Sequence, residues 1–541
     1  MHLPAAGFMD PRFDCDPAHP VEPSLQAELR QDSMEVQHLA EEIRVLDARR
    51  RDLLSRRNEI LSTINILPPE LLSLIFELAC PPRKQSAGAD SKDNFTQYQH
   101  PLRLGAVSSY WREVAWSIPH LWTQISPFPS RELPRPIDLG SINKDIIAAY
   151  CRNSRSLPID LHLNFRSFST KSKASFEDAS RIFRALLVRS AGRIRSLVCA
   201  VNGADTAGVW SLLTSDFMSS EELCNLGEVH FSESTSSSQP FSAPLFADVP
   251  QNLRRVTLHR HPWSLHENFW GLLTSLELNS LFTTQCLRIL VQCTNLVEFK
   301  AFSRSTGPTI TLIPPEEPIT FENLQRWTGH FLANEPINFF IYTSFRLPAV
   351  KLLDLGESSD PIPSADEEIA DWEQFFGSMT NLKEIRSSYW GCQIDNWAAI
   401  WDIVGSSVQE LEMSFLEPSQ ALAFINLMTP TSNQLADKQL PSLKALRATL
   451  CLNSDRMSRF LDMVEMRRKD HIRTTNLEVA APFENIVLHL CSHRRVAHPE
   501  KCCKRFTKVH RERIEQLVRD GLTFEINEWC EMGKEWVTLE W

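Results

Sequence analysis

One short phrase recurs from about residue 190 onward: an apolar residue, two mostly polar residues and a second apolar residue, often followed by an alternating one. Eleven copies keep the same phase over 283 residues and ten steps, which gives a mean period of 28.3 residues. A chain built in this way is expected to grow as a solenoid, in which each copy contacts mainly its neighbours. The leading apolar residues are Ile194, Leu226, Leu253, Leu273, Leu296, Leu324, Val350, Leu382, Val408, Leu443 and Leu477.

This period is typical of leucine-rich repeats, in which each copy adds one short strand to a parallel sheet and a return segment, often helical, to the other side. Individual steps range from 20 to 35 residues, so the repeats are degenerate. The same phrase also occurs in ordinary amphipathic α/β domains, which remain the alternative. The sequence therefore favours an α/β fold with an irregular leucine-rich-repeat solenoid and a C-terminal cap at 191–541, after a connecting helical and strand region at 127–190. An asparagine often precedes the leading residue, but it stands before the strand, so no asparagine ladder is predicted.

Residues 25–64 contain neither Pro nor Gly, and their apolar residues recur at steps of three and four. This spacing predicts a long, coiled-coil-like helix. Charged Asp32, Arg50 and Arg57 interrupt the seam, so we expect the helix either to self-associate or to pack on its own chain. Five prolines predict a disordered arm over residues 1–24. The apolar seam residues are Leu29, Val36, Leu39, Ile43, Leu46, Leu53, Ile60 and Ile64.

Two apolar helical stretches follow at 65–126, separated by a polar segment. The first, LPPELLSLIFELAC from Leu67, opens with prolines that suit a first helical turn. The second, PLRLGAVSSYWREVAW from Pro101, is followed by SIPHLW. Between them, the breaker-rich residues at about 81–100 predict an inserted loop.

This segment resembles an F-box, in the form common among fungal F-box-like proteins with leucine-rich-repeat tails. The resemblance implies a small all-α module that docks onto the Skp-type adaptor of a cullin-RING ubiquitin ligase, while the repeats hold a protein substrate. Such a module cannot bury all of its apolar side chains within itself, which fits a helix-in-groove contact. Leu74 and Leu78 are instead expected to pack against the start of the solenoid. Carried over by position, the adaptor-binding candidates are Leu67, Pro68, Leu71, Leu72, Ile75, Phe76, Leu104, Val107 and Trp111.

Motifs for catalysis are absent from the sequence: it contains no GxSxG elbow, Walker A loop, GxGxxG or HExxH. Only 17 glycines occur in 541 residues, which leaves few positions for tight catalytic or phosphate-binding turns. We therefore expect no enzyme activity, no catalytic residue and no cofactor. Cysteines and histidines between Cys491 and His510 match no standard zinc spacing, and the basic segment 492–513 lies in a chain of net charge −11, so metal and nucleic acid are disfavoured.

Thirteen scattered cysteines, without a signal peptide or a long apolar window, predict a reduced protein in the cytoplasm or nucleus, with no membrane partner. Two tryptophans, Trp327 and Trp390, are speculative substrate anchors on the concave face of the solenoid. Together with these features, the resemblance to an F-box implies a non-catalytic substrate receptor of a ubiquitin ligase, with an unknown protein substrate. The alternative is a scaffold or assembly protein outside ubiquitination, which uses the repeats and the N-terminal helix to bind proteins.

Overall fold

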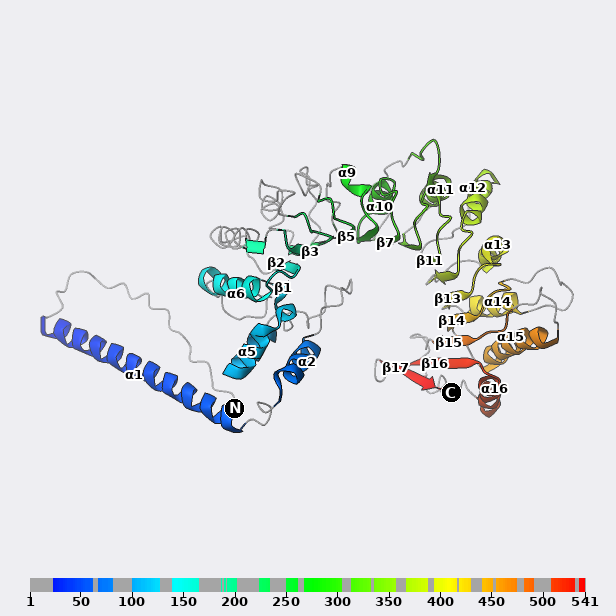
Figure 1. The fold of residues 1–541 in the computed structure, drawn as a ribbon. Helices are drawn as coiled ribbons and strands as arrows, with labels where there is room; N and C mark the ends of the chain where they lie inside the picture. Colours follow the sequence, from blue (N-terminus) through cyan, green and yellow to red (C-terminus); the bar gives the residue numbers. More distant parts are fainter. Residues whose placement is uncertain are drawn as a thin grey trace. The chain divides into compact units, whose positions relative to one another are not determined.

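The structure is a computed structural model, and its elements are shown in Figure 1. The chain divides into two compact units, residues 1–121 and 122–541, which are described separately. The residues that the structure describes are 23–61, 67–80, 100–126, 139–164, 186, 189–190, 192–201, 223–233, 250–260, 267–303, 313–331, 335–356, 366–387, 394–415, 418–429, 440–450, 454–473, 481–490, 507–530 and 535–540.

The first unit begins with the expected long helix, α1 (Pro23–Leu61). It starts two residues earlier than the seam suggests, because proline is compatible with a first helical turn. Most of the expected arm and nearly all of the inserted loop lie outside the described residues. A group of short helices follows, which we call the helical module: α2 (Pro69–Ala79), α4 (His100–Val107), α5 (Ser109–Ser117) and the 3-10 turn η2 (Pro119–Trp122), whose last residue belongs to the second unit.

The second unit is built on one large sheet. Among the described residues, fifteen strands follow one another in chain order, and all neighbours are parallel except β16 and β17. A separate pair joins β8 (Ile319–Thr320) to β10 (Phe345–Arg346). The strands of the large sheet are β1 (Gln124–Ile125), β2 (Ile159–Asn164), β3 (Ile194–Val201), β4 (Glu228–Glu233), β5 (Arg255–His259), β6 (Ser275–Asn279), β7 (Glu298–Phe302), β9 (Arg326–His330), β11 (Leu352–Leu355), β12 (Glu384–Ser387), β13 (Glu410–Phe415), β14 (Ala445–Leu450), β15 (Asn485–Leu490), β16 (Thr523–Cys530) and β17 (Glu535–Glu540).

Helices connect these strands and lie along one side of the sheet, as Figure 1 shows. The opposite side, which we call the open face, carries no described helix. This confirms a mixed α/β, solenoid-like fold with a long N-terminal helix and a large parallel sheet. The helices of this unit are α6 (Leu139–Asn153), α9 (Glu267–Trp270), α10 (Thr283–Leu290), α11 (Glu335–Ser344), α12 (Asp366–Gly377), α13 (Ile394–Val404), α14 (Pro418–Met428), α15 (Ser454–Arg473) and α16 (Lys508–Arg519).

Alternation along each strand separates the core from the open face, because successive side chains point to opposite sides of a sheet. The described leading residues of the phrase are buried, from Ile194 to Leu443. Three residues further on, a second apolar residue is buried in register with its neighbours. This inner row consists of Leu197, Val229, Val256, Leu276, Phe299, Trp327, Leu353, Ile385, Leu411 and Leu446.

The sheet extends beyond the copies of the repeated phrase at both ends. Strand β1 lies in the segment 65–126 and β2 in the connecting helical and strand region 127–190, and both already belong to the sheet. Near the C-terminus, the doubtful phrase at Asn476 lies outside the described residues, and β15 begins instead at Asn485, two residues after buried Phe483. These strands were harder to recognise because their surroundings depart from the repeated phrase.

Asparagine side chains join successive repeats, although no ladder was predicted. Asn252 Nδ2 donates to the Cys224 carbonyl oxygen at 2.6 Å, and Asn295 Nδ2 donates to that of Gly271 at 2.7 Å. Each acceptor lies two residues before the leading residue of the preceding repeat. The amide thus supplies a hydrogen-bond donor to a backbone carbonyl at the turn that precedes the neighbouring strand, and this links each repeat to the one before it. Equivalent bonds are made by Asn225, Asn381 and Ser442.

Candidate functional site

The helical module has a small core formed by one side of α2. Leu72 and Phe76, which lie one turn apart, are both fully buried. The Phe76 ring packs against the Trp111 ring of α5 with 5.0 Å between the ring centroids. Aromatic contacts in this tilted geometry add to the free energy gained from burial alone. Phe76 and Trp111 therefore hold α2 against α5.

Polar contacts fix the connections within the module. Tyr110 Oη donates to the carbonyl oxygen of Leu67, two residues before α2, at 2.9 Å, which ties α5 to the start of α2. Arg112 Nε donates to the Gly105 carbonyl oxygen of α4 at 2.8 Å. Ser108 caps α5, since its Oγ accepts from the Trp111 backbone N–H at 3.1 Å. The segment VSSYWR thus supplies a cap, a tie to each neighbouring helix and one core aromatic.

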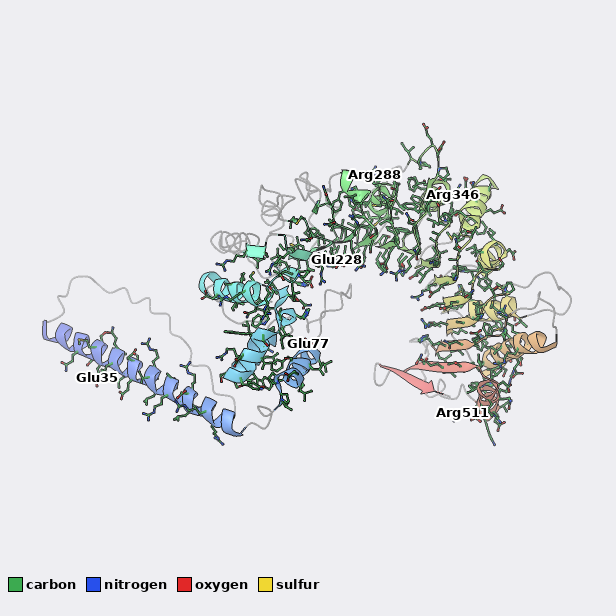
Figure 2. All side chains as sticks on the ribbon, in the orientation of Figure 1. Glu35, Glu77, Glu228, Arg288, Arg346 and Arg511 are labelled. Carbon is green, nitrogen blue, oxygen red and sulfur yellow. The ribbon has the colours of Figure 1, made fainter. Side chains whose placement is uncertain are left out.

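The other side of α2 is apolar and exposed. Leu71, Leu74, Ile75 and Leu78 form what we call the apolar stripe, with side chains 51%, 53%, 41% and 73% exposed. At about 100° per residue they span roughly a third of the helix circumference. Glu77, labelled in Figure 2, is one of the polar residues on the same helix. A stripe of four exposed aliphatic side chains on an eleven-residue helix is the kind of surface that marks an interaction site.

The nine adaptor-binding candidates divide between this surface and the core. Pro68, Leu71, Ile75 and Val107 are exposed, and Leu67, Leu104 and Trp111 are half-buried. Leu72 and Phe76 are corrected to core residues, because they lie on the side of α2 that faces α5. Leu74 and Leu78 are exposed on α2 and belong to the apolar stripe.

One exposed apolar residue of the module was missed. Trp116 on α5 is 47% exposed. A large aromatic side chain left in solvent near the end of a short helix is a candidate anchor for a partner. Because Trp116 stands five residues after Trp111, the two side chains point to different sides of α5. This spacing could have predicted that Trp116 lies outside the core of the module.

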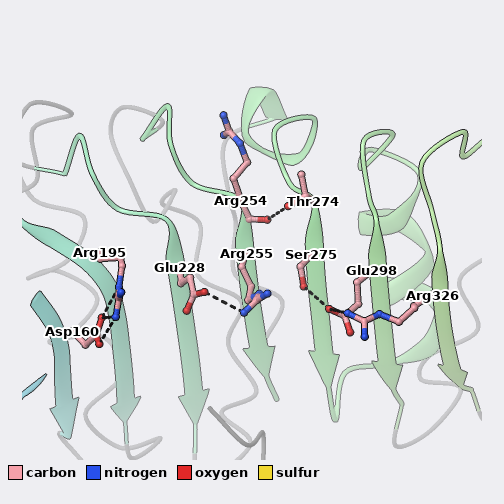
Figure 3. Close-up of polar contacts among 9 residues, drawn as sticks. All are labelled: Asp160, Arg195, Glu228, Arg254, Arg255, Thr274, Ser275, Glu298 and Arg326. Atoms are coloured by element: carbon pink, nitrogen blue, oxygen red, sulfur yellow. Dashed lines mark hydrogen bonds and ion pairs between the residues drawn. The ribbon is translucent and has the colours of Figure 1, made fainter. Parts of the chain in front are cut away.

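The open face of the sheet carries rows of charged side chains that pair across the strands (Figure 3). Arg195 donates to Asp160 through Nε and Nη2, with Nη2 2.7 Å from Oδ2. Arg255 Nη1 lies 3.1 Å from Glu228 Oε1 on the neighbouring strand. Opposite charges on adjacent strands stabilise the register of the pairing. Similar contacts continue through Glu298 with Lys300 and Arg326, and through Glu412 with Arg386 and Arg447.

In these pairs the cation lies further out than the carboxylate. The Arg195 side chain is 59% exposed and its partner Asp160 only 14%. Around Glu298, burial would raise the carboxyl pKa, but Lys300 and Arg326 outweigh that effect and the pKa is lowered. Glu298 therefore stays ionised and forms ion pairs with both Lys300 and Arg326. The outermost groups along this row are guanidinium and ammonium groups, which are suited to meet carboxylates of a partner.

An aromatic group interrupts the charged rows at the ends of β7 and β9. The Phe302 and His330 rings lie 4.7 Å apart, and His330 Nε2 lies 3.1 Å from Asp354 Oδ1. The His330 ring occupies the space above Gly356, where an added Cβ would lie 2.0 Å from its Cγ atom. Only glycine fits beneath the ring at that position. Phe302 remains 37% exposed and is an apolar contact point among the charged side chains of this face.

Neither tryptophan proposed as a substrate anchor lies on this described surface. Trp327 is 1% exposed and packs on Phe299, with 5.1 Å between ring centroids. This corrects the expectation for Trp327: it belongs to the inner row and fills the space between sheet and helices. Trp390 lies outside the described residues.

A close Ser–His pair between α15 and α16 is arranged as a structural contact. His510 Nδ1 accepts from the Thr507 backbone N–H, which leaves the proton of the neutral ring on Nε2. That nitrogen lies 2.8 Å from Ser458 Oγ, whose hydroxyl can donate to the Ser454 carbonyl oxygen at 3.2 Å. Ser458 is thus an acceptor from the histidine and is not activated by it as a nucleophile.

In the described part of the chain, few other side chains are candidates for metal binding or reactivity. Most of the Cys/His cluster between Cys491 and His510 lies outside it, and His510 is a buried residue of α16. Within the described ranges, no group of three or more His, Cys, Asp or Glu side chains is placed to hold a metal ion. Burial raises the pKa of the Cys80 thiol to about 11, so that it is protonated at neutral pH. None of the helices seen in these ranges has the length and apolar character needed to cross a membrane.

Comparisons with known proteins identify no family. No family model matches the chain, and no curated protein matches it. Among solved structures, it is similar to a crystal structure of a Bacteroides fragilis protein, with 10% sequence identity and a TM-score of 0.29. That similarity covers 48% of this chain and 75% of the other, and at this TM-score it carries no weight for fold or function.

Proposed function

We propose that the chain is a substrate receptor of a Skp-cullin-F-box ubiquitin ligase, in which the helical module is an F-box that binds the Skp-type adaptor. The apolar stripe of α2 is the observation that carries this proposal. Leu71 and Ile75 were assigned to the adaptor from their F-box-like positions, and both are exposed. Leu74 and Leu78 extend the same surface and add apolar area to it.

The energetics suit docking of one helix face into an apolar groove. Full burial of a wholly exposed aliphatic side chain is worth about 1.5–3 kcal/mol. Because these four side chains are about half exposed, their burial can supply about 3–7 kcal/mol, a large part of the roughly 8 kcal/mol of a micromolar complex. The module's own core is small, with Leu72 and Phe76 as the buried residues of α2. Exposed leucines therefore contribute little to the fold of the module and are available to a partner.

The solenoid, which we interpret as degenerate leucine-rich repeats, holds a protein substrate on its open face. Cations such as Arg255 and Arg326 at the outer rim, together with exposed Phe302, favour a partner segment with acidic residues beside an apolar one. Catalysis then takes place on other subunits. The receptor raises the local concentration of substrate near the charged ubiquitin carrier and needs no acid, base or nucleophile of its own.

A second function, as a scaffold outside ubiquitination, is favoured by one observation. All side chains described on α1 are exposed, including several Leu, Val and Ile. Such a helix can assemble chains whether or not the module binds an adaptor. Adaptor binding distinguishes the two functions.

The test is co-expression of the full chain with a Skp-type adaptor, followed by size-exclusion chromatography with light scattering. We expect the two proteins to elute together with one adaptor per chain, because the apolar stripe is already formed in the chain alone. A folded chain that elutes without the adaptor, at concentrations of about 10 µM, would contradict the receptor function and leave the scaffold.

A further inference from the structure

The long helix α1 presents an uncovered seam. Val36, Leu39, Ile43, Leu46 and Leu53 are between 49% and 65% exposed. They follow the alternating steps of three and four residues that place side chains along one line of a helix. Burying these five aliphatic side chains against a partner would be strongly favourable.

Charge is divided between the two halves of this helix. Residues 31–42 contain four carboxylates and no Lys or Arg, a net charge of −4. Residues 43–57 contain six Arg and two Asp, a net charge of +4. Glu35, labelled in Figure 2, lies in the acidic half. The halves of two copies are therefore complementary only when the helices run in opposite directions.

Parallel pairing of two copies brings like charges together. In a parallel, in-register pair, each seam residue meets its own copy. Asp32 would face Asp32, Arg50 would face Arg50, and Arg57 would face Arg57, all within the seam. A parallel pair would also place Glu42 beside Asp47 of the other helix, another repulsive contact. Buried like charges cost several kcal/mol, so this orientation is disfavoured.

Antiparallel pairing changes these contacts into favourable ones. With Ile43 opposite Leu46 of the second copy, Val36 meets Leu53 and Asp32 meets Arg57. Leu39 then meets Arg50, whose aliphatic stem can cover it while the guanidinium reaches solvent. Each contact occurs twice because the pair has two-fold symmetry. The charged interruptions of the seam are thus accommodated.

Flanking residues select the same register. In this arrangement Glu35 lies beside Arg56 of the second copy, and Glu42 beside Arg49, so that the flanks contribute four attractive contacts per pair. A shift by one heptad would instead place Glu42 opposite its own copy at the centre, or Arg49 if the shift is in the other direction. In the single chain, Arg56 pairs with Asp52 at 3.0 Å, but both side chains are more than half exposed. Such an exposed pair is weak enough to be exchanged for contacts with another chain.

We infer that α1 is an antiparallel dimerisation helix whose partner is the α1 of a second copy, with Asp32 of each chain beside Arg57 of the other. This inference is independent of adaptor binding by the helical module. A dimer formed in this way carries two open faces and two apolar stripes.

Charge exchange in the full-length chain tests the orientation. We expect Arg49→Glu/Arg56→Glu, and separately Glu35→Arg/Glu42→Arg, to raise the dimer dissociation constant about tenfold or more, because attractive flanks become repulsive. Mixing the two variants, or combining all four substitutions in one chain, restores the dimer. In parallel helices these residues lie about 10–30 Å apart along the axis and cannot compensate one another. Sedimentation velocity measures the monomer–dimer equilibrium.

The matched control is Arg44→Glu/Arg51→Glu, which makes the same charge change at two positions away from the seam and its flanks. It is expected to leave the dimer intact. A full-length chain that remains monomeric at about 100 µM, as it would if α1 packed on its own chain, overturns the inference. Failure of the mixed variants to restore the dimer overturns it as well.

A distance measurement tests the register. Met34 is 71% exposed and lies away from the seam, so it can be replaced by a spin-labelled noncanonical residue that leaves the native cysteines untouched. In the antiparallel register the two labelled sites are separated along the axis by about 31 Å. A separation of about 25 Å or less overturns the inference, because it indicates parallel helices or a register shifted by one heptad, and so does one of about 40 Å or more, which indicates the opposite shift.

Discussion

The variant Leu71→Asp/Ile75→Asp is expected to bind the Skp-type adaptor at least about 100-fold more weakly than the natural chain. Both side chains are exposed, so the substitutions remove no contact from the core of the module. In a complex, however, two aliphatic side chains would be replaced by carboxylates that lose water without gaining a partner. Isothermal titration of purified adaptor into the full-length variant measures the loss.

A matched control distinguishes a lost docking surface from a general effect of added charge. Met466 on α15 and Val509 on α16 are 45% and 61% exposed, comparable with Ile75 and Leu71. Met466→Asp/Val509→Asp is therefore expected to bind the adaptor with unchanged affinity. Circular dichroism checks that both variants are folded. Equal affinity of the folded Leu71→Asp/Ile75→Asp variant and the natural chain would contradict docking through α2.

The variant Trp327→Ala is expected to destabilise the repeats by about 3–5 kcal/mol, because it removes a large buried side chain and leaves a cavity. Trp327 is 1% exposed and has the rings of Phe299, Phe331 and Phe345 around it. Stability in a solenoid depends on contacts between neighbouring repeats, and this cluster joins several of them. Urea unfolding followed by circular dichroism measures the change.

Phe302→Ala provides the contrasting substitution in the same region. Phe302 is 37% exposed on the open face, so its removal is expected to cost less than about 1 kcal/mol of unfolding free energy. If Trp327→Ala unfolded within about 1 kcal/mol of the natural chain, Trp327 could not be the packed core residue described above.

The repeat phase could be predicted because it depends on short-range spacing. The buried leading residues and the inner row both follow from one apolar residue and a second one three positions later. The same spacing could have assigned Trp327 to the core, since it stands three residues after Leu324, as Phe299 does after Leu296. Because aromatic residues are also typical of interfaces, Trp327 was instead interpreted as a substrate anchor.

The open face was harder to predict, because its contacts join residues from different repeats. Arg255 meets Glu228 across strands that are 27 residues apart, while Arg326 meets Glu298 across 28. Repeat lengths vary from 20 to 35 residues, so the sequence alone does not show which charges share a row. In the helical module, the spacing of apolar residues predicted the helix α2. Which side of α2 packs on α5 is decided by the contact between Phe76 and Trp111, which the spacing alone does not show.

Hydrogen exchange of the full-length chain, measured by mass spectrometry with and without saturating Skp-type adaptor, tests the receptor function most directly. The apolar stripe predicts that the adaptor slows exchange in 67–80 and in 100–117, while the strands of the solenoid keep their rates. Unchanged exchange in the helical module, or slowing confined to the solenoid, would contradict the docking of this module onto the adaptor.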